Sequence, residues 1–451
     1  MGLPVDADDA ADGLIEYLRA SPSPFHACQQ AARLLTAAGF TAVTETRAFP
    51  AEPGRYFLIR GGSLVAWSTE HAAGPATPLR VVGAHTDSPN LRVKPQPDLA
   101  RAGWRQLGVE VYGGPLLNSW LDRDLGLSGR VSLRADSTGD AAESVEHPGA
   151  ADPAGVHTRL LHIDEPILRI SQLAIHLDRS VNSEGVTLNP QQHLAPIWGL
   201  ESTAPQGFRQ FLADRLDVHA DAVLGWDLMT HDTAPPRRIG ASGELIAGGR
   251  LDNLATSYAG TRALIAASGR RPAQPLTRLL VLFDHEEVGS VSERGAYSAL
   301  LPAVLERMVL AAGGSRDDYH RALAGTVIAS GDMAHATHPN YAERHEPQHQ
   351  ITVGGGPVLK INNNLRYATG APGAAAFVLA CEQAGVPVQH FVTRSDLPCG
   401  STVGPMTAAL TGAQTVDFGA PMLSMHSARE MAGVADQAMY IAALTAFLDP
   451  A

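Results

Sequence analysis

The sequence predicts an α/β protein with a mostly parallel central sheet flanked by helices, plus an inserted β-rich domain. Before about residue 95 and again after residue 240, short apolar segments alternate with helical segments, as in parallel sheets covered on both faces. Between these blocks, proline, glycine and alternating strand patterns dominate. A chain of 451 residues also exceeds one ordinary core. We therefore expect residues 1–95 and 241–451 to form one domain and residues 96–240 to form the insert.

The first block is expected to hold two helices and a buried strand. Helical spacing covers residues 13–18 and 25–38, and the sequence Ser-Pro-Ser-Pro separates the two segments. Residues 80–84, RVVGA, read as a short apolar strand that leads directly into His85 and Asp87. Two polar, titratable side chains thus follow a buried strand at once.

In the insert, residues 106–112 and 127–133 alternate as strands do. Residues 135–154 are acidic and of low complexity. Because that stretch has little apolar surface to bury, we expect it to be a mobile surface loop.

After residue 240 the α/β alternation resumes and ends in a long helix. Ser427 and Glu430 have the S-x-x-E spacing of a capping box for that last helix. The expected helices cover about 253–268, 301–311, 371–384 and 428–448, and the expected strands cover 278–283, 326–329, 388–393 and 415–418.

Composition and charge exclude several classes of function. The formal net charge is −12 and no run of Lys or Arg occurs, which argues against a nucleic-acid partner. No apolar tract is long enough to span a bilayer, so we expect no membrane partner. The acidic amino-terminal segment lacks the pattern of a secretory signal, and the three cysteines form no C-x-x-C pair. These features predict a cytoplasmic protein.

Polar side chains gather just beyond the predicted strands of the α/β domain. They are His85 with Asp87, Glu286 with Glu287, Asp332, and His426. In open parallel sheets, ligands bind outside the carboxyl ends of the strands, so these sequence-distant residues are expected to converge. Asp252 instead opens a helix, after Gly248 and Gly249.

The composition of this set favours a metal centre. It holds two histidines and several carboxylates but no cysteine, which suits Zn²⁺, Mn²⁺ or Co²⁺ better than it suits a thiolate zinc site. One tetrahedral ion would leave carboxylates over. Two ions about 3.5 to 4 Å apart, sharing a carboxylate and a water, would use them and relieve the repulsion between adjacent glutamates.

Each motif alone also has a plain structural explanation. His85 could be a surface histidine, Glu286 and Glu287 a solvated turn, Asp332 a helix cap, and His426 a contact of the capping box. Their joint position at strand ends favours the metal centre.

With these residues in view, the chain resembles the M18 metallopeptidases, the aspartyl aminopeptidase group of the two-metal aminopeptidases. The resemblance rests on seven ordered motifs: GAHTDSP (83–89), GRLDN (249–253), DHEEVGS (284–290), SGDMAHATHPNY (330–341), LKINNNLRYAT (359–369), RSDLPCGSTVGP (394–405) and MHSARE (425–430). It implies a metallo-aminopeptidase that removes N-terminal Asp or Glu from peptides.

The resemblance also implies roles for the metal-site residues. Asp252 would bridge two divalent ions, Zn²⁺ first, with Mn²⁺ or Co²⁺ as alternatives. His85 and Asp332 would complete one ion's site, and Glu287 and His426 the other's. Asp87 would orient the His85 ring. Glu286 would be the general base for the bridging water, because an unligated carboxylate remains basic while a ligated one does not.

Substrate contacts and assembly are implied in the same way. Lys360 would hold the acidic side chain of the substrate, with Tyr367 and His335 as further substrate-binding residues; the plain alternative for Lys360 is an ordinary surface lysine. His176 would reach the active site of a neighbouring subunit, with His193 as a second candidate. The insert would then serve oligomerisation, and the family's tetrahedral homo-dodecamer is implied here.

Three other readings of the same residues stay open. One is an aminopeptidase of the same fold that prefers neutral N-terminal residues. A second is a catalytically idle scaffold that only self-assembles, although every site residue is present. A third is a two-metal deacylase or carboxypeptidase, which would not require a free α-amine on its substrate.

Overall fold

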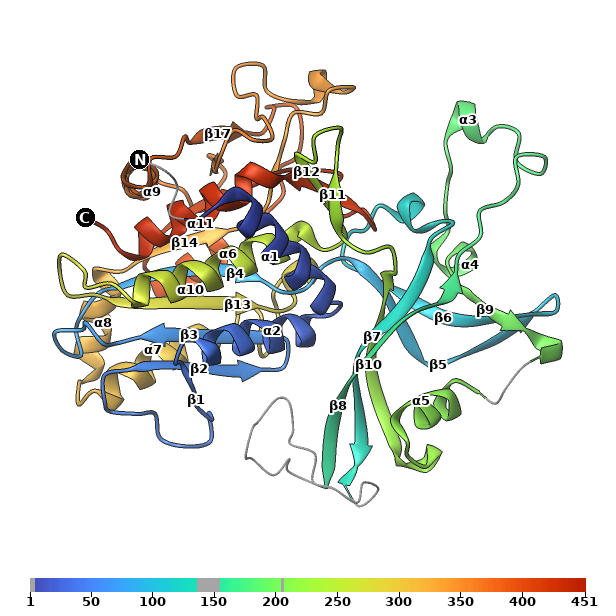
Figure 1. Ribbon diagram of the computed structural model, residues 1–451, viewed down its shortest axis with the longest axis horizontal. Coiled ribbons are helices and arrows are strands. Elements are labelled where there is room, and N and C mark those ends of the chain that lie inside the picture. The colour runs from blue at the N-terminus through green and yellow to red at the C-terminus, as the bar shows by residue number, and fades with distance from the viewer. Residues whose placement is uncertain (1–4, 136–154, 204–206) are drawn as a thin grey trace. The chain divides into compact units, whose positions relative to one another are not determined.

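The computed structural model describes residues 5–135, 155–203 and 207–451, and these fall into two compact units (Figure 1). The first unit comprises residues 1–87, 236–425 and 430–451, and the second comprises residues 88–235 and 426–429. The acidic stretch expected to be a mobile loop lies, from residue 136 on, outside the described residues. Among the described residues, no helix is both long enough and apolar enough to cross a membrane.

A nine-stranded mixed sheet forms the centre of the first unit. Its strand order is β1-β2-β3-β13-β4-β14-β18-β16-β17, and most neighbouring pairs are parallel. This confirms the predicted α/β class with a mostly parallel sheet. The strands are β1 (Thr41–Ala42), β2 (Arg55–Arg60), β3 (Ser63–Ser68), β4 (Leu79–His85), β13 (Thr277–Phe283), β14 (Val327–Gly331), β16 (Val358–Ile361), β17 (Gln389–Val392) and β18 (Gln414–Gly419).

Helices cover both faces of this sheet, which explains why its central strands are apolar without alternation. In β13, Leu280 and Leu282 pack into one core while Leu279 and Val281 pack into the other. The first core contains side chains of α1 (Ala7–Ala20), α2 (Pro24–Ala37), α6 (Leu251–Ser268), α9 (Ala371–Ala384) and α11 (Val434–Leu448). The second contains side chains of α7 (Leu300–Ala311), α8 (Arg316–Ala324) and α10 (Val403–Thr411).

The last helix begins later than predicted. Instead of a helix from residue 428, the chain forms strand β20 (Glu430–Gly433), and Gly433 is the N-cap of α11. Ser427 and Glu430 therefore do not form a capping box, and that expectation was wrong.

A second sheet of the first unit has the order β11-β12-β20-β19-β15. Its strands are β11 (Arg237–Ile239), β12 (Leu245–Gly248), β15 (Ala334–His335), β19 (Pro421–Leu423) and β20 (Glu430–Gly433).

The second unit is a closed barrel around its own apolar core. Its order is β10-β5-β6-β9-β8-β7, and its pairs are antiparallel. The strands are β5 (Asn90–Arg101), β6 (Trp104–Tyr112), β7 (Asp124–Arg134), β8 (Val156–Arg169), β9 (Ile197–Leu200) and β10 (Val223–Asp232). Its helices are α3 (Val181–Glu184), α4 (Pro190–His193) and α5 (Phe208–Leu216), and the short 3-10 turns of the two units are η1 (Leu117–Trp120), η3 (Glu201–Thr203), η4 (Ala220–Ala222), η5 (Glu286–Val288) and η6 (Ala342–Arg344).

Candidate active site

Parallel register brings three of the predicted site segments to one edge of the central sheet. His85, the last residue of β4, lies opposite Phe283, the last residue of β13. Gly83 of β4 lies opposite Ser330 of β14. Strands β13 and β14 are thus the two parallel neighbours of β4. The chain leaves β13 towards the glutamate pair and leaves β14 towards Asp332, so both segments begin beside His85.

Carboxylates from three separate segments surround the Nε2 atom of His85. This atom lies 3.4 Å from Asp252 Oδ1, 3.6 Å from Asp332 Oδ1 and 3.9 Å from Glu286 Oε2. One ligand atom each from His85, Asp252 and Glu287 also lies within 4.8 Å of the other two. His85 is 1% exposed, so it is not the surface histidine that its motif alone allowed.

Asp87 contacts both the histidine and the glutamate pair. The Nδ1 atom of His85 lies 2.9 Å from the backbone carbonyl of Asp87 and 3.5 Å from its carboxylate. The same carboxylate accepts the backbone N–H groups of Glu286 and Glu287, each at 3.1 Å. A carbonyl only accepts, so the proton of a neutral His85 ring belongs on Nδ1, and its Nε2 lone pair faces the carboxylates.

Burial and mutual repulsion make this cluster bind protons when no cation is present. Burial raises the pKa of Glu286 to about 8, with like charges on Asp332, Asp87 and Asp252 adding to the effect and His85 opposing it. Burial, then Asp252 and Glu286, raises the pKa of Glu287 well above its usual range. For His85, burial lowers the pKa, but hydrogen bonds with the three aspartates outweigh it and raise the pKa well above its usual range.

The donor set fits divalent transition metals. It offers one imidazole nitrogen and several carboxylate oxygens in a buried position, and borderline ions such as Zn²⁺ accept both donor types. A divalent ion would replace the protons that the cluster otherwise holds, because it supplies the positive charge that buried carboxylates require.

Asp252 has a support that the sequence did not reveal. It lies near the start of α6, and its backbone N–H donates to Glu430 Oε2 at 3.1 Å. Glu430 is 2% exposed and belongs to β20. The sequence analysis assigned Glu430 to a capping box; its place in the MHSARE motif was the signal that could have linked it to the site.

Lys360 is buried beside the same cluster. It lies in β16, is 3% exposed, and its Nζ atom is 3.5 Å from Asp332 Oδ2. The ring of Tyr367 lies 5.4 Å from the Lys360 ammonium. The alternative of an ordinary surface lysine is therefore wrong.

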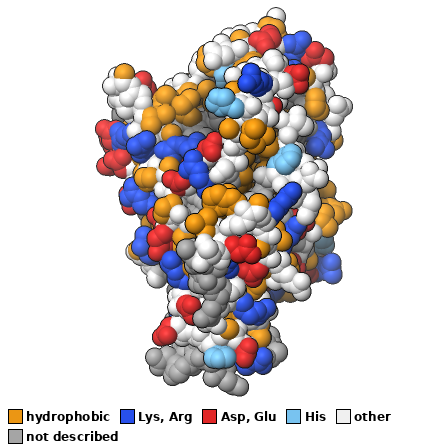
Figure 2. Space-filling view, turned by 90° about the vertical axis from the view of Figure 1, so that its right-hand side faces the viewer, with side chains coloured by type: hydrophobic (Ala, Val, Ile, Leu, Met, Phe, Trp, Pro, Cys, Tyr) orange, Lys and Arg blue, Asp and Glu red, His pale blue; other side chains and the backbone are white. Residues whose placement is uncertain are grey.

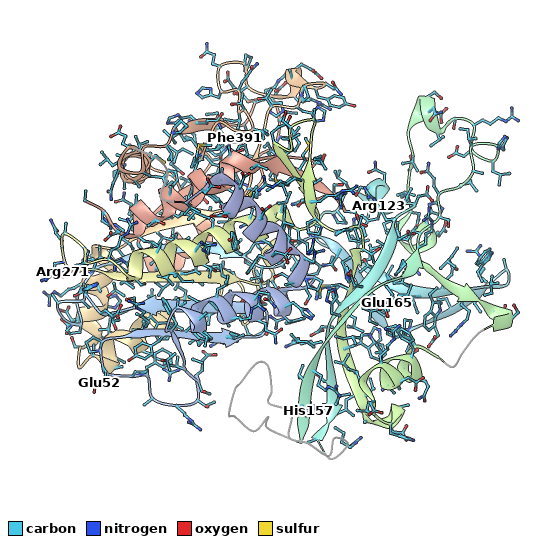
Figure 3. All side chains as sticks on the ribbon, in the orientation of Figure 1. Glu52, Arg123, His157, Glu165, Arg271 and Phe391 are labelled. Atoms are coloured by element: carbon cyan, nitrogen blue, oxygen red, sulfur yellow. The ribbon has the colours of Figure 1, made fainter. Side chains whose placement is uncertain are left out.

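Aromatic side chains continue from Lys360 towards His335. The ring centroid of Tyr367 is 6.4 Å from that of Phe391, which Figure 3 labels in β17, and the His335 ring is 6.0 Å from Phe391. Tyr367 is buried and His335 is exposed. The three predicted substrate-binding residues, Lys360, Tyr367 and His335, are thus linked through Phe391.

Asp417 is a further buried carboxylate that sequence analysis missed. Its side chain accepts from the Thr402 hydroxyl at 2.6 Å and from the Ala368 backbone at 2.5 Å. Burial raises the pKa of Asp417, while hydrogen bonds from Ser330 and Thr402 and the charge of Lys360 oppose that rise. An acidic residue inside the apolar strand TVDFG was the available signal.

The other three predicted site residues belong to the second unit. His426 has a left-handed backbone conformation, with φ 66°, and its Nδ1 lies 3.0 Å from the carbonyl of Gly114. His176 is exposed in a turn at residues 175–177, and His193 ends α4. Their functional roles stay predictions.

Comparison with known proteins agrees with these motifs. The sequence profile of the family described as Aminopeptidase I zinc metalloprotease (M18) matches residues 17–448. This chain belongs to the M18 family. It is a metal-dependent aminopeptidase, and that prediction is confirmed.

Relatives cover the M18 chain almost completely. A probable M18 family aminopeptidase 2 of Streptomyces coelicolor is 51% identical over 440 residues, 97% of each chain. A protein of the same description from Mycobacterium tuberculosis is 52% identical over 442 residues, 97% of this chain and 98% of the relative.

Solved structures share the whole fold. A chain in the cryo-EM structure of the Ape4 and Nbr1 complex aligns with a TM-score of 0.91 at 34% identity, covering 100% of this chain and 88% of that one. The M18 family aminopeptidase of Thermotoga maritima aligns with a TM-score of 0.83 at 21% identity, covering 99% and 97%, and is evidence for the fold alone.

Proposed function

We propose that this M18 enzyme removes N-terminal Asp or Glu residues from peptides with two divalent ions, Zn²⁺ first. Asp252 is assigned to both ions, His85 and Asp332 to one, and Glu287 and His426 to the other. The observation that carries the two-ion proposal is the excess of buried carboxylates around His85. When bound, such ions polarise the scissile carbonyl and lower the pKa of the attacking water.

Glu286 is the proposed general base. Its Oε2 atom lies 3.9 Å from His85 Nε2, which places the carboxylate next to the assigned ligand set. As a carboxylate outside the assigned ligand set, Glu286 can accept a proton from water and return it to the leaving amine. Asp87 is the proposed positioning residue, since it holds both the His85 ring and the backbone of Glu286.

Lys360 is the proposed determinant of acidic specificity. A buried ammonium is costly unless negative groups compensate it, and here it lies 3.5 Å from Asp332 and interacts electrostatically with the buried Asp417. A substrate carboxylate beside Lys360 would add a further ion pair to this ammonium. Tyr367 shapes the site by presenting its ring to the ammonium, and His335 extends the contact surface.

Substrate panels test this specificity directly. Turnover of Asp-, Glu- and Leu-anilides by the wild type and by Lys360→Met is compared, with metal content measured for both. We expect the substitution to lower kcat/KM for the acidic substrates by about 10² to 10³-fold, the cost of leaving a carboxylate unpaired, and to affect the Leu substrate far less. Preference of the wild type for Leu-anilide would support the neutral-residue alternative instead.

A blocked substrate separates the remaining alternatives. An aminopeptidase fails on N-acetyl-aspartyl peptides, whereas a deacylase or carboxypeptidase does not require the free amine. A catalytically idle scaffold turns over none of these substrates while keeping its metals.

His176 is proposed to act on the active site of a neighbouring subunit within a homo-oligomer, with a tetrahedral dodecamer as the proposed assembly. A yeast relative's structure is described as an mApe1 dodecamer, at 25% identity. The turn carrying His176 exposes apolar neighbours, Leu173 at 57% and Leu177 at 74%. Figure 2 shows the side of the molecule that lies to the right in Figure 1, where hydrophobic side chains interrupt a mixed charged surface. His193 is less suited, because its Nδ1 accepts from the backbone of Asn189 at 3.0 Å.

Subunit mixing tests the action in trans. His176→Ala and Glu286→Gln variants are each expected to be inactive, and co-assembled subunits should regain part of the activity because some sites then hold one intact copy of each residue. Sedimentation measures the oligomer in parallel. No recovery in verified mixed oligomers would contradict the role of His176.

The cytoplasm is the proposed compartment, on the basis of the free cysteines Cys28, Cys381 and Cys399.

A further inference from the structure

A second cluster of metal-ligand side chains lies entirely within the barrel unit. His162 and Asp164 stand two residues apart on β8, and His231 lies near the end of β10. One ligand atom of each lies within 4.8 Å of the other two. We propose that His162, Asp164 and His231 bind a divalent transition-metal ion, with Zn²⁺ as the first choice, at a site separate from the catalytic ligand set.

Both histidines direct the same ring nitrogen towards one oxygen. The Nε2 atoms of His162 and His231 lie 3.9 Å and 3.6 Å from Asp164 Oδ1. In a tetrahedral zinc site with ligands at about 2.0 to 2.2 Å, neighbouring ligand atoms are roughly 3.3 to 3.5 Å apart. The two distances to the Asp164 oxygen exceed that spacing by roughly half an ångström or less, and the ligand atoms of the two histidines lie within 4.8 Å of each other. The two ring planes are inclined by 60° with centroids 5.3 Å apart, so the rings are not stacked face to face.

The course of the strands makes this approach unusual. Strand β7 pairs with both β8 and β10, placing Ser128 opposite His162 and Gly126 opposite His231. Side chains on the two outer strands would ordinarily start about 9.5 Å apart, two strand spacings. Gly126 removes the obstacle between them, because a Cβ there would lie only 2.8 Å from His231 Nε2 and 2.9 Å from its Cε1. The absence of that side chain lets the imidazole reach across β7.

Burial and donor chemistry indicate the kind of ion. The His231 side chain is 3% exposed, whereas those of His162 and Asp164 are 33% and 66% exposed, so the cluster has a fixed inner ligand and an outer side open to solvent. Figure 3 labels His157 and Glu165 on β8, the strand whose sequence also contains His162 and Asp164. Two imidazoles and one carboxylate suit Zn²⁺, Co²⁺, Ni²⁺ or Cu²⁺ and offer too few oxygens for Ca²⁺ or Mg²⁺. Water would fill the remaining position.

An ion at this position would join β8 to β10 across β7. The three residues come from strands that do not pair with each other, so the ion would add a link that the hydrogen-bond ladders of the barrel lack. Because the ligand atoms are assembled only in the folded barrel, binding would stabilise the folded state.

The test compares the zinc content of each variant with that of the wild type. Ions bound at the catalytic site contribute equally to both values and do not affect the difference. Full-length wild type, His162→Asn and Asp164→Asn are equilibrated with micromolar Zn²⁺, desalted and analysed for zinc per chain. We expect each variant to hold about one ion fewer than the wild type, since three protein ligands are the usual minimum for such a site. Both replaced side chains are partly exposed, so the barrel is expected to fold, and near-ultraviolet circular dichroism checks this.

His219 and Asp221 provide a matched control in the same unit. They have the same i, i+2 spacing, with Nδ1 and Oδ2 3.5 Å apart, but their side chains are 82% and 92% exposed and they belong to neither potential metal cluster among the described residues. His219→Asn should keep the wild-type zinc count. Equal zinc in wild type, His162→Asn and Asp164→Asn would overturn the proposal, and an equal loss in His219→Asn would indicate an adventitious ion only.

Discussion

The two units each gather potential metal ligands, but by different means. In the first unit, the side chains come from the ends of parallel strands and the start of a helix, and they are almost wholly buried. In the barrel, they come from antiparallel strands and lie half open to solvent. The first cluster has an excess of carboxylates, whose negative charge must be balanced by protons or cations. The barrel cluster has a single carboxylate and two imidazoles, which can be neutral.

The first cluster therefore requires a cation or protons to offset its negative charge, whereas the barrel cluster can bind an ion without requiring one. Without a cation, burial raises the pKa of Glu286 to about 8 and raises that of Glu287 well above its usual range, so the buried carboxyls of the first cluster bind protons. The barrel cluster has no comparable crowding of like charge. We therefore expect catalysis and stability to depend on metal in the first unit, and stability alone to respond in the second.

The largest effect is expected from Asp252→Asn. This change removes the carboxylate assigned to both ions and leaves a neutral amide of the same shape. Turnover should fall by about 10⁴-fold or more, with loss of bound metal. Elemental analysis and anilide hydrolysis measure both, and wild-type metal content in this variant would break the assignment of Asp252.

The metal-free enzyme should lose stability as pH rises. Because the pKa of Glu286 is raised from 4.5 to about 8 in the folded state, the folded state binds this proton more tightly than the unfolded state does. Stability is therefore highest below pH 4.5 as far as this group is concerned, and it declines as pH rises to about 8. Thermal unfolding of chelated protein across this window should show the decline, and Glu286→Gln should make it smaller by removing this group's share. Added Zn²⁺ should reverse it.

Glu430 is expected to have a smaller effect, as a positioning residue. Glu430→Ala removes the acceptor of the Asp252 N–H and should weaken metal binding by about 10 to 100-fold, as losses of supporting contacts do. Glu430→Gln keeps an oxygen acceptor and should restore most of the affinity. Metal titration of both variants distinguishes this role from a general loss of stability, in which Gln would not rescue.

The smallest effect concerns the barrel. Gly126→Ala places a Cβ 2.2 Å from the carbonyl oxygen of Ile163 and close to the His231 ring, and it should destabilise the barrel by about 1 to 3 kcal/mol. Gly225→Ala, on the strand of His231, is the control, because a Cβ there meets nothing within 4 Å. Calorimetry of the two variants should show a lower unfolding temperature only for Gly126→Ala.

Much of the first unit was predictable because its signals are local and repeated. The apolar runs before His85 and Glu286 predicted strands, and the parallel-sheet rule predicted that the polar residues after them would converge. The start of α11 was not predictable from the S-x-x-E pattern, since Glu430 hydrogen-bonds to a residue 178 positions away in sequence. Such contacts depend on tertiary structure, which overrides capping patterns.

The barrel cluster shows more clearly which contacts could not be predicted from the sequence. His162 and Asp164 suggest a pair on one strand face, but nothing in their spacing points to His231, which reaches them across β7 only because Gly126 has no side chain. Lys360 was assigned through resemblance, and its burial beside Asp332 followed only from the fold. Long-range pairing across a strand has no short sequence pattern.

The central claim is a division of labour between adjacent glutamates, with Glu286 as the base and Glu287 as a metal ligand. Parallel measurement of metal content and turnover in Glu286→Gln and Glu287→Gln tests it most directly. We expect Glu286→Gln to keep the metal content of the wild type while kcat falls by about 10² to 10⁴-fold, and Glu287→Gln to lose both metal and activity. Substantial turnover in Glu286→Gln, or metal loss from it equal to that of Glu287→Gln, would contradict the account.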